Sequence, residues 1–300
     1  MSTAPGGGEP ADAARLAFLQ EQARRIRAEV VRSVYHAKAG HLGGPLSAAD
    51  LLAALYFHEL RIRPDQPAWP DRDRFILSKG HSSIALYAAM ALRGYFPVEE
   101  LLTFDGAHSR LQGHPDMTRL PGIDMSTGSL GMGISAAMGM ALGAHLTGRD
   151  IRAFVMLGDG ECQEGEVWEA AMSAPRYGLD NLVAIVDHNK LQQYGWPGDG
   201  PDGRIAPQDP GELAGKWRAF GWRVLEVDGH DMAAILDVLA AARTGDGRPV
   251  VIIAHTVKGK GVSYMEGHWF WHTRAIKPEE YATAMRELGE PDPETEGAAR

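Results

Sequence analysis

Cysteine is nearly absent from this 300-residue sequence, in which Cys162 is the only example. One cysteine cannot form a disulfide within the chain, and it cannot build a cysteine-based zinc site. Such scarcity fits the reducing cytoplasm, where we expect the protein to work. We interpret Cys162 itself as a small buried side chain.

Long apolar runs and basic clusters are missing as well. No window approaches the roughly 18 consecutive apolar residues of a membrane span, so we expect no membrane insertion. The N-terminus has neither the basic start nor the apolar stretch of a secretory signal. A formal net charge of −9 argues against binding to nucleic acid, which needs a clustered positive surface. Lys258 and Lys260 form a local basic spot that either steers a phosphate or is solvated surface, and we prefer the interpretation as solvated surface.

Strands and helices alternate along the sequence. Five short apolar or β-branched runs predict strands, and they start at Arg74, Ile151, Asn181, Trp222 and Pro249. Helical patterns lie before and between them, at about 14–38, from Ser47 onward, and at 135–146, 166–177, 211–220 and 231–243. Strands that are apolar throughout and separated by helices predict an α/β fold, with a mainly parallel sheet and helices on both faces.

The sequence shows no internal repeat and no interior linker rich in Pro or Ser. We therefore expect one domain over residues 13–287, preceded by a disordered tail over 1–12 and followed by a frayed tail over 288–300. Within this domain, Ser47 is expected to cap the second helix, because it stands three residues before Asp50 at the start of an apolar helical run.

Two oxygen-bearing side chains follow neighbouring predicted strands. Asp159 stands between Gly158 and Gly160 directly after one strand, and Asn189 ends the next. Parallel strands joined by a helix bring their carboxyl ends to one sheet edge, where ligands of α/β folds bind. A carboxylate, an amide oxygen and a carbonyl near Leu191 suit Mg²⁺, with Ca²⁺ as the alternative, and leave coordination positions for a diphosphate. The alternative interpretation is that the Asp caps a helix and the Asn shapes a turn.

The whole pattern resembles the thiamine diphosphate motif. From about Lys38 to Ala275 the sequence is similar to the N-terminal, cofactor-binding half of transketolase. The segments that carry this resemblance are GHLGGPLSAADLLAALYF, DRFILSKGHSSIALYAAM, LQGHPD, STGSLGMGISAAMGMALG, LGDGECQEGEVWEAA, VDHNK, WRAFGWRVLEVDGHD and HTVKGKGVSYMEGHWFWH. They occur in this order, and together they are specific.

The resemblance implies roles for residues around the metal. It implies that Asp159, Asn189 and the Leu191 carbonyl hold Mg²⁺, and that Gly158 and Gly160 bring backbone close to the diphosphate. These implied ligands agree with the metal site that the spacing predicts.

Four histidines match histidines of the family. His81 is implied to lie near the diphosphate, and His272 near the diphosphate and the donor substrate. The matches for His41 and His114 line the substrate channel. An imidazole can donate a hydrogen bond to a sugar hydroxyl or accept one, and it can exchange a proton near neutral pH. Each could instead be structural, so their convergence in space is the expectation that matters.

The resemblance also places Gly128 and Leu130 against the rings of the cofactor. Glu164 matches an acid beneath the aminopyrimidine, although a helix-capping carboxylate is an equally good interpretation. The segment STGSLGMGISAA contains the GxGxxA spacing of a dinucleotide-binding turn. We reject that interpretation because the preceding LPGIDM does not resemble a buried strand.

The resemblance ends before the pyrimidine-binding and C-terminal domains of full-length transketolase. In the family, the pyrimidine-binding domain supplies the Glu that activates the aminopyrimidine, and no residue here matches it. The resemblance therefore implies a split enzyme in which a separately encoded C-terminal subunit completes the site, most simply as a heterotetramer. The implied reaction is ketol transfer from a ketose (phosphate) to an aldose (phosphate). Two segments, KLQQYGWPGDGPDG and GHWFWH, are unusual for the family and are expected to border the substrate channel. The substrates therefore need not be ordinary pentose phosphates.

Two other functions compete with this one. The first is another thiamine diphosphate enzyme, such as a 2-oxo acid dehydrogenase component or deoxyxylulose phosphate synthase. The motifs GHLGGPLS, SKGHSS and QGHPD argue against it, since they look specific to transketolase. The second is a noncatalytic subunit that retains the fold, and the presence of the metal ligands and channel histidines argues against that.

Overall fold

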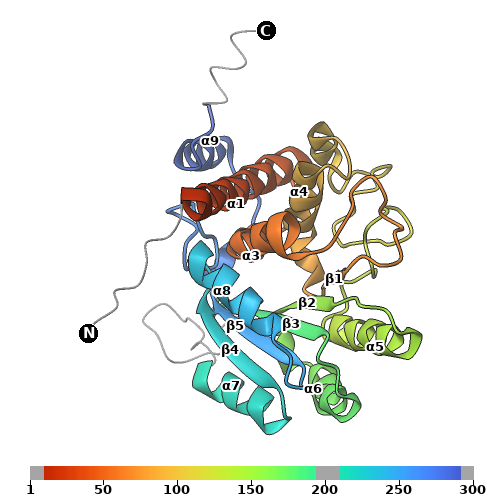
Figure 1. The fold of residues 1–300 in the computed structure, drawn as a ribbon. Helices are drawn as coiled ribbons and strands as arrows, with labels where there is room; N and C mark the ends of the chain where they lie inside the picture. Colours follow the sequence, from red (N-terminus) through yellow and green to blue (C-terminus); the bar gives the residue numbers. More distant parts are fainter. Residues whose placement is uncertain (1–9, 194–209, 292–300) are drawn as a thin grey trace.

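The computed structural model describes residues 10–193 and 210–291, and within them lies one five-stranded sheet. Its strands are β1 (Arg74–Leu77), β2 (Ala153–Gly158), β3 (Leu182–His188), β4 (Arg223–Asp228) and β5 (Val250–His255). They lie in the order β1-β2-β3-β5-β4, and every neighbouring pair is parallel (Figure 1). The predicted strands and the predicted parallel sheet are confirmed.

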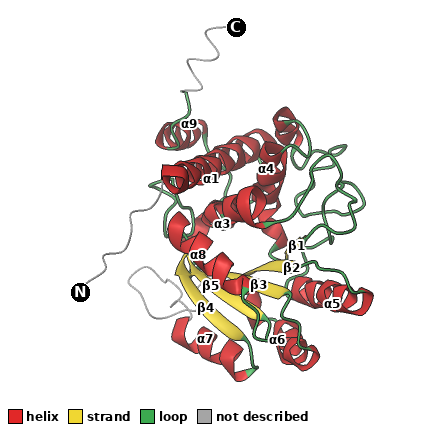
Figure 2. Ribbon diagram, in the orientation of Figure 1, coloured by secondary structure: helices red, strands yellow, loops and turns green. Residues whose placement is uncertain are grey.

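Helices cover both faces of this sheet (Figure 2). The α-helices are α1 (Pro10–Ala37), α2 (Gly43–Ser47), α3 (Ala49–Ala54), α4 (Ser83–Arg93), α5 (Met132–Thr147), α6 (Gly165–Ser173), α7 (Pro210–Ala219), α8 (Met232–Arg243) and α9 (Pro278–Glu287). Short 3₁₀ segments span Gly80–Ser82, Val98–Thr103, Glu161–Gln163, Ala174–Tyr177 and Trp269–His272, and a π-helical turn spans Leu55–Glu59.

Alternate residues of the strands point into two separate hydrophobic cores. In β2, Phe154 and Met156 pack with the core that includes α1, α3, α4 and α8, whereas Val155 and Leu157 pack with α5, α6 and α7. Successive side chains of a strand face opposite sides, and both sides here are covered. This explains why β2, whose two faces are both covered, carries no polar side chain.

The ends of the domain differ from the expected boundaries. The first helix begins at Pro10, so residues 10–12 are helical. Near the other end, Glu290 forms ion pairs with Arg24 at 2.8 Å and with Arg32 at 3.1 Å, which hold this residue against α1. The rest of the expected tails, residues 1–9 and 292–300, lies outside the described residues.

The predicted cap at Ser47 is wrong. Helix formation begins earlier, at Gly43, and Ser47 is the last residue of α2; the residue before α3 is Ala48, which has no capping side chain. The Ser47 hydroxyl instead lies 2.6 Å from the Asp187 carboxylate. In a cap the hydroxyl oxygen would accept from backbone N–H groups, whereas here the hydroxyl donates to a buried carboxylate, which is a strong acceptor. No helix in the described part of the chain is long and apolar enough to cross a membrane.

Candidate active site

The strands β2 and β3 bring Asp159 and Asn189 to the same sheet edge, as predicted. The two strands pair with Gly158 opposite Asp187, and each is followed at once by the residue in question. The Lys190 N–H donates to Asp159 Oδ2 at 2.7 Å, and the Gly160 N–H donates to Oδ1 at 2.8 Å. Backbone around both residues therefore holds the Asp159 carboxylate in place.

A cavity of about 810 Å³ opens at this edge. It is lined by every residue that the sequence singled out for the site: His41, His81, His114, Gly128, Leu130, Gly158, Asp159, Gly160, Glu164, Asn189, Leu191 and His272. Other residues that line it were not singled out for the site, among them Lys79, Glu161 and Lys258. Residues spread over more than 230 positions of sequence thus converge at one place, since His41 and His272 are both present.

The four histidines form a cluster. The ring centres of His41, His81 and His272 lie 5.0 to 5.1 Å apart, and that of His114 lies 6.5 Å from His41. Burial, together with nearby positive groups, lowers the pKa of His41 to about 4 and that of His272 to about 3, and it lowers the pKa of His81 as well. These three imidazoles are neutral at pH 7, so each can donate one hydrogen bond and accept one.

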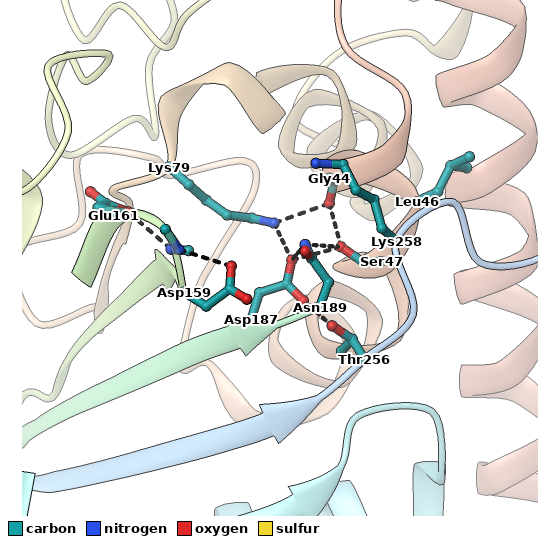
Figure 3. Close-up of polar contacts among 12 residues, drawn as sticks. Gly44, Leu46, Ser47, Lys79, Asp159, Glu161, Asp187, Asn189, Thr256 and Lys258 are labelled. Atoms are coloured by element: carbon teal, nitrogen blue, oxygen red, sulfur yellow. Dashed lines mark hydrogen bonds and ion pairs between the residues drawn. The ribbon is translucent and has the colours of Figure 1, made fainter. Parts of the chain in front are cut away.

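A buried polar network supports the metal-ligand candidates (Figure 3). Asp187 lies at its centre and accepts hydrogen bonds from Ser47, Lys79, Thr256 and Asn189. Burial favours a higher pKa for Asp187, but the Lys79 ammonium and the hydrogen bonds outweigh it and lower the pKa. The sequence motif DHN, in which Asp187 stands two residues before Asn189, could have drawn attention to this carboxylate.

Lys258 is buried in the cavity wall, so its interpretation as solvated surface is wrong. Only 2% of the residue is exposed, and its Nζ lies 3.0 Å from the Leu191 carbonyl and 2.9 Å from His272 Nδ1. Burial lowers its pKa to about 8, against the opposing effect of Asp159. A Cβ on Gly43 would lie 2.7 Å from Lys258 Cγ, so this glycine makes room for the side chain. Lys260, in contrast, lies at the surface and pairs with Glu266 at 3.4 Å.

Glu161 joins two glycine loops of the cavity wall. Its carboxylate accepts from the Gly131 N–H at 2.9 Å, from the Gly158 N–H at 3.0 Å and from the Ser78 hydroxyl at 2.5 Å. One carboxylate therefore holds the loop at Gly131 and the loop at Gly158 together. The sequence motifs do not single out Glu161.

Cys162, the next residue, is buried, as expected.

Glu164 occupies the N-cap position of α6, but its side chain makes no capping hydrogen bond. Its Cβ would lie 2.7 Å from a Cβ placed on Gly131, which adopts a φ of +88°. The close approach explains why glycine is needed there.

No strand occurs among the residues that precede α5, 120–131, so rejecting the dinucleotide interpretation was correct.

The two unusual segments meet the cavity in part. Gln192 and Gln193 of the first line it, whereas residues 194–209 lie outside the described part of the chain. In the second, Trp271 is buried and His272 lines the cavity, while Trp269 and Phe270 are each 41% exposed.

No three His, Cys, Asp or Glu side chains among the described residues could hold a metal, so an oxygen site would depend on Asn189 and a carbonyl.

Comparison with known proteins identifies the family. A model described as the thiamine diphosphate-binding domain of transketolase matches residues 19–296. This chain belongs to the transketolase family. The resemblance seen in the sequence is therefore confirmed.

Relatives within the family include separate subunits. The 6-deoxy-6-sulfo-D-fructose transketolase subunit of Clostridium sp. is 45% identical over 280 residues, covering 93% of this chain and 98% of that protein. An apulose-4-phosphate transketolase subunit of Phocaeicola vulgatus is 42% identical over 272 residues, covering 91% and 94%. The solved transketolase of Campylobacter jejuni has a TM-score of 0.82 at 31% identity, and the match covers 94% of this chain but only 45% of that one.

Proposed function

We propose that this chain is the cofactor-binding subunit of a split transketolase. In this proposal it binds thiamine diphosphate and Mg²⁺, and together with a separately encoded subunit it transfers a two-carbon ketol unit from a ketose to an aldose. The observation that carries the proposal is the convergence of Asp159, Asn189 and four histidines in one cavity at the sheet edge. The cytoplasm remains the proposed location, on the basis of the single, buried cysteine.

The donor set fits a hard cation. Asp159 offers a carboxylate, Asn189 an amide oxygen and Leu191 a carbonyl, and Mg²⁺ prefers oxygen ligands of this kind, with Ca²⁺ as the alternative. Burial and the nearby Asp187 carboxylate raise the pKa of Asp159 to about 6. Because burial and a like charge disfavour the ionised form of this carboxylate, a bound cation would stabilise it. Binding of the cation to the Leu191 carbonyl would compete with the hydrogen bond from Lys258.

The surrounding wall suits a diphosphate. The Lys258 ammonium supplies positive charge beside Asp159, and His81 supplies a neutral imidazole. Gly160 lets the Gln192 side chain pack against the backbone at this point, because a Cβ there would lie 3.1 Å from Gln192 Cγ. Gly128 adopts a φ of +146°, and a Cβ on it would lie 3.0 Å from the His114 ring. We assign Gly128, Leu130 and Glu164 to the rings of the cofactor.

The cofactor, when bound, supplies the carbanion chemistry that breaks and forms the carbon–carbon bond. The chain itself binds and orients the sugar. Because His41 and His272 are neutral at pH 7, they can donate to or accept from sugar hydroxyls, and a neutral imidazole can also take up a proton. His114, at the edge of the cluster, is assigned to the same channel.

A partner subunit is proposed because this chain matches whole subunits but less than half of a complete transketolase. Helix α5 supports it. Met132 and Leu146 on this helix are 43% and 79% exposed, and Met172 on α6 is 51% exposed. A Cβ built on Gly139 or Gly143 meets no described atom within 4 Å, so another helix could approach closely. Exposed apolar side chains on two neighbouring helices, next to glycines open to solvent, favour a subunit contact here. We expect a heterotetramer.

The substrates are proposed as a ketose, with or without a phosphate, and an aldose. Two relatives bear the names of different sugars, a sulfosugar and apulose 4-phosphate, which favours an unusual donor over an ordinary pentose phosphate. The exposed Trp269 and Phe270, next to His272, offer an aromatic border that a sugar could contact.

The test is reconstitution. The isolated chain with Mg²⁺ and thiamine diphosphate is expected to show little or no ketol transfer, and adding the subunit encoded beside it should restore turnover. Donor ketoses and pyruvate should be compared, because use of pyruvate alone would favour a different thiamine diphosphate enzyme. Turnover by the isolated chain equal to that of the pair would contradict the split-enzyme proposal. An Asp159→Ala chain mixed with the same partner serves as the inactive control.

A further inference from the structure

The side chain of Asn189 can serve a metal in only one of its two orientations. An amide carries one oxygen, which can coordinate a hard cation, and one NH₂ group, which cannot. Rotating the amide by half a turn exchanges the two. A metal site that depends on Asn189 therefore needs a second group that fixes the orientation of this amide.

Asp187 supplies such a group. The Asn189 Nδ2 lies 3.3 Å from Asp187 Oδ2 and 3.3 Å from the Ser47 hydroxyl. Asp187 is fully buried and forms an ion pair with the equally buried Lys79. An ionised carboxylate only accepts hydrogen bonds, so it faces the NH₂ group and repels the amide oxygen. The oxygen is left on the other side, where it accepts the Leu191 N–H at 3.2 Å.

Neighbouring contacts keep the carboxylate from turning. Lys79 also donates to the Gly44 carbonyl at 3.0 Å, and Thr256 donates to the second oxygen of Asp187. Asp187 and Asn189 stand two residues apart at the end of β3, and such residues point to the same side of an extended chain. The strand thus delivers the orienting group and the oriented group together (Figure 3).

We propose that Asp187, held by Lys79, is the positioning residue of the candidate metal site: it turns the Asn189 amide so that its oxygen faces the cavity. The metal rests on the proposed function. The orientation of the amide rests only on contacts within this chain, and the two can be tested separately. Partners in the second layer around a metal commonly change its affinity about 10- to 100-fold.

The sequence offers an internal control, because it contains only two asparagines, Asn181 and Asn189. Selective ¹⁵N-asparagine labelling of the full chain therefore gives two side-chain NH₂ signals, which an Asn189→Ala chain assigns. Asn181 lies at the opposite end of β3 and donates to the Ala141 and Ile151 carbonyls at 3.1 and 3.2 Å. Both amides are expected to exchange with solvent slowly in the unaltered chain. Exchange of Asn189 at the rate of a free amide would overturn the proposal without any variant.

The decisive variant is Lys79→Met/Asp187→Leu, which removes the buried ion pair as a unit and so avoids leaving one charge unpaired. Exchange of the Asn189 amide should become at least about tenfold faster, since a hydrogen bond to a charged acceptor is lost. Exchange of the Asn181 amide should not change. Thr256→Val is the matched control: it removes a hydrogen bond to the other oxygen of Asp187, but Lys79 still holds the oxygen that faces the amide, so both amides should keep their slow exchange. Unaltered Asn189 exchange in a folded double variant would overturn the proposal.

Titration with Mn²⁺ in the presence of thiamine diphosphate supplies the second readout. Paramagnetic broadening should reach the Asn189 signal and spare Asn181, and the double variant should bind Mn²⁺ about 10- to 100-fold more weakly. Faster amide exchange with unchanged Mn²⁺ affinity would overturn the positioning role. If the unaltered chain binds no Mn²⁺ near Asn189, the metal assignment falls, while the exchange measurements still decide whether Asp187 orients the amide.

Discussion

Asp159 is expected to lower the stability of the metal-free chain at neutral pH. The residue is 4% exposed, and burial together with the Asp187 carboxylate raises its pKa from 3.8 to about 6. Below pH 3.8 the group is neutral in both the folded and the unfolded chain. As pH rises toward 6 it ionises in the unfolded chain first, so the free energy of unfolding falls. Since each tenfold change in an ionisation equilibrium is worth about 1.4 kcal/mol, the full loss is about 3 kcal/mol.

The perturbation that isolates this effect is Asp159→Asn. Asn189, Asp187 and the rest of the network remain, but one of the two backbone hydrogen bonds to residue 159 is lost, at about 1 kcal/mol at every pH. The informative quantity is therefore the difference between the two chains at pH 8 minus the difference at pH 4. That double difference should favour the variant by about 2.4 kcal/mol, because about 0.6 kcal/mol of the full loss has already occurred at pH 4.

Urea unfolding of the chain in a chelator, followed by circular dichroism, measures this quantity. Parallel stability curves for the two chains between pH 4 and pH 8 would refute the reasoning, because the carboxylate would then have an ordinary pKa. Adding Mg²⁺ and thiamine diphosphate should reverse the order at pH 8. Only the chain with Asp159 should gain stability, since a bound ligand stabilises the state that binds it.

Two further predictions concern side chains of the cavity wall. His114→Ala should lower kcat of the reconstituted enzyme by about 10²-fold or more at saturating cofactor with little change in cofactor affinity, whereas His108→Ala, outside the cavity, should have no effect; steady-state kinetics decides, and unchanged kinetics would make His114 structural. Lys258→Met should weaken binding of thiamine diphosphate by about 10- to 100-fold through loss of a charged contact, whereas Lys260→Met should not; equal affinities in a calorimetric titration would contradict the role of Lys258.

The framework of the fold could be predicted from the sequence because its signals are local. Each strand is a short apolar run, and in each crossover helix the apolar residues recur at helical spacing. The alternation of these two patterns is enough to indicate a parallel sheet. Asp159 and Asn189 could be placed together because parallel strands share an edge. Ser47 could not, since its interaction with Asp187 spans 140 positions and no local pattern indicates it.

Lys258 shows the same limit for charge. In the sequence, VKGKG has two lysines in equivalent surroundings, and nothing local separates them. In the structure Gly43 makes room for one, which is buried, while the other meets Glu266 at the surface. Burial of a lysine depends on a glycine more than 200 positions away. The same holds for Lys79, whose partner Asp187 lies on another strand-helix unit.

The cavity holds a carboxylate and an ammonium group, and burial disfavours the charged form of both. Burial raises the pKa of Asp159 to about 6 and lowers that of Lys258 to about 8, so each is held closer to neutrality than in water. A divalent cation at Asp159 and a diphosphate at Lys258 would stabilise both charged forms at once. Each ligand would also compensate the charge of the other. Because coupling between two bound ligands is reciprocal, Mg²⁺ should raise the affinity for thiamine diphosphate by the same factor as the cofactor raises that for Mg²⁺.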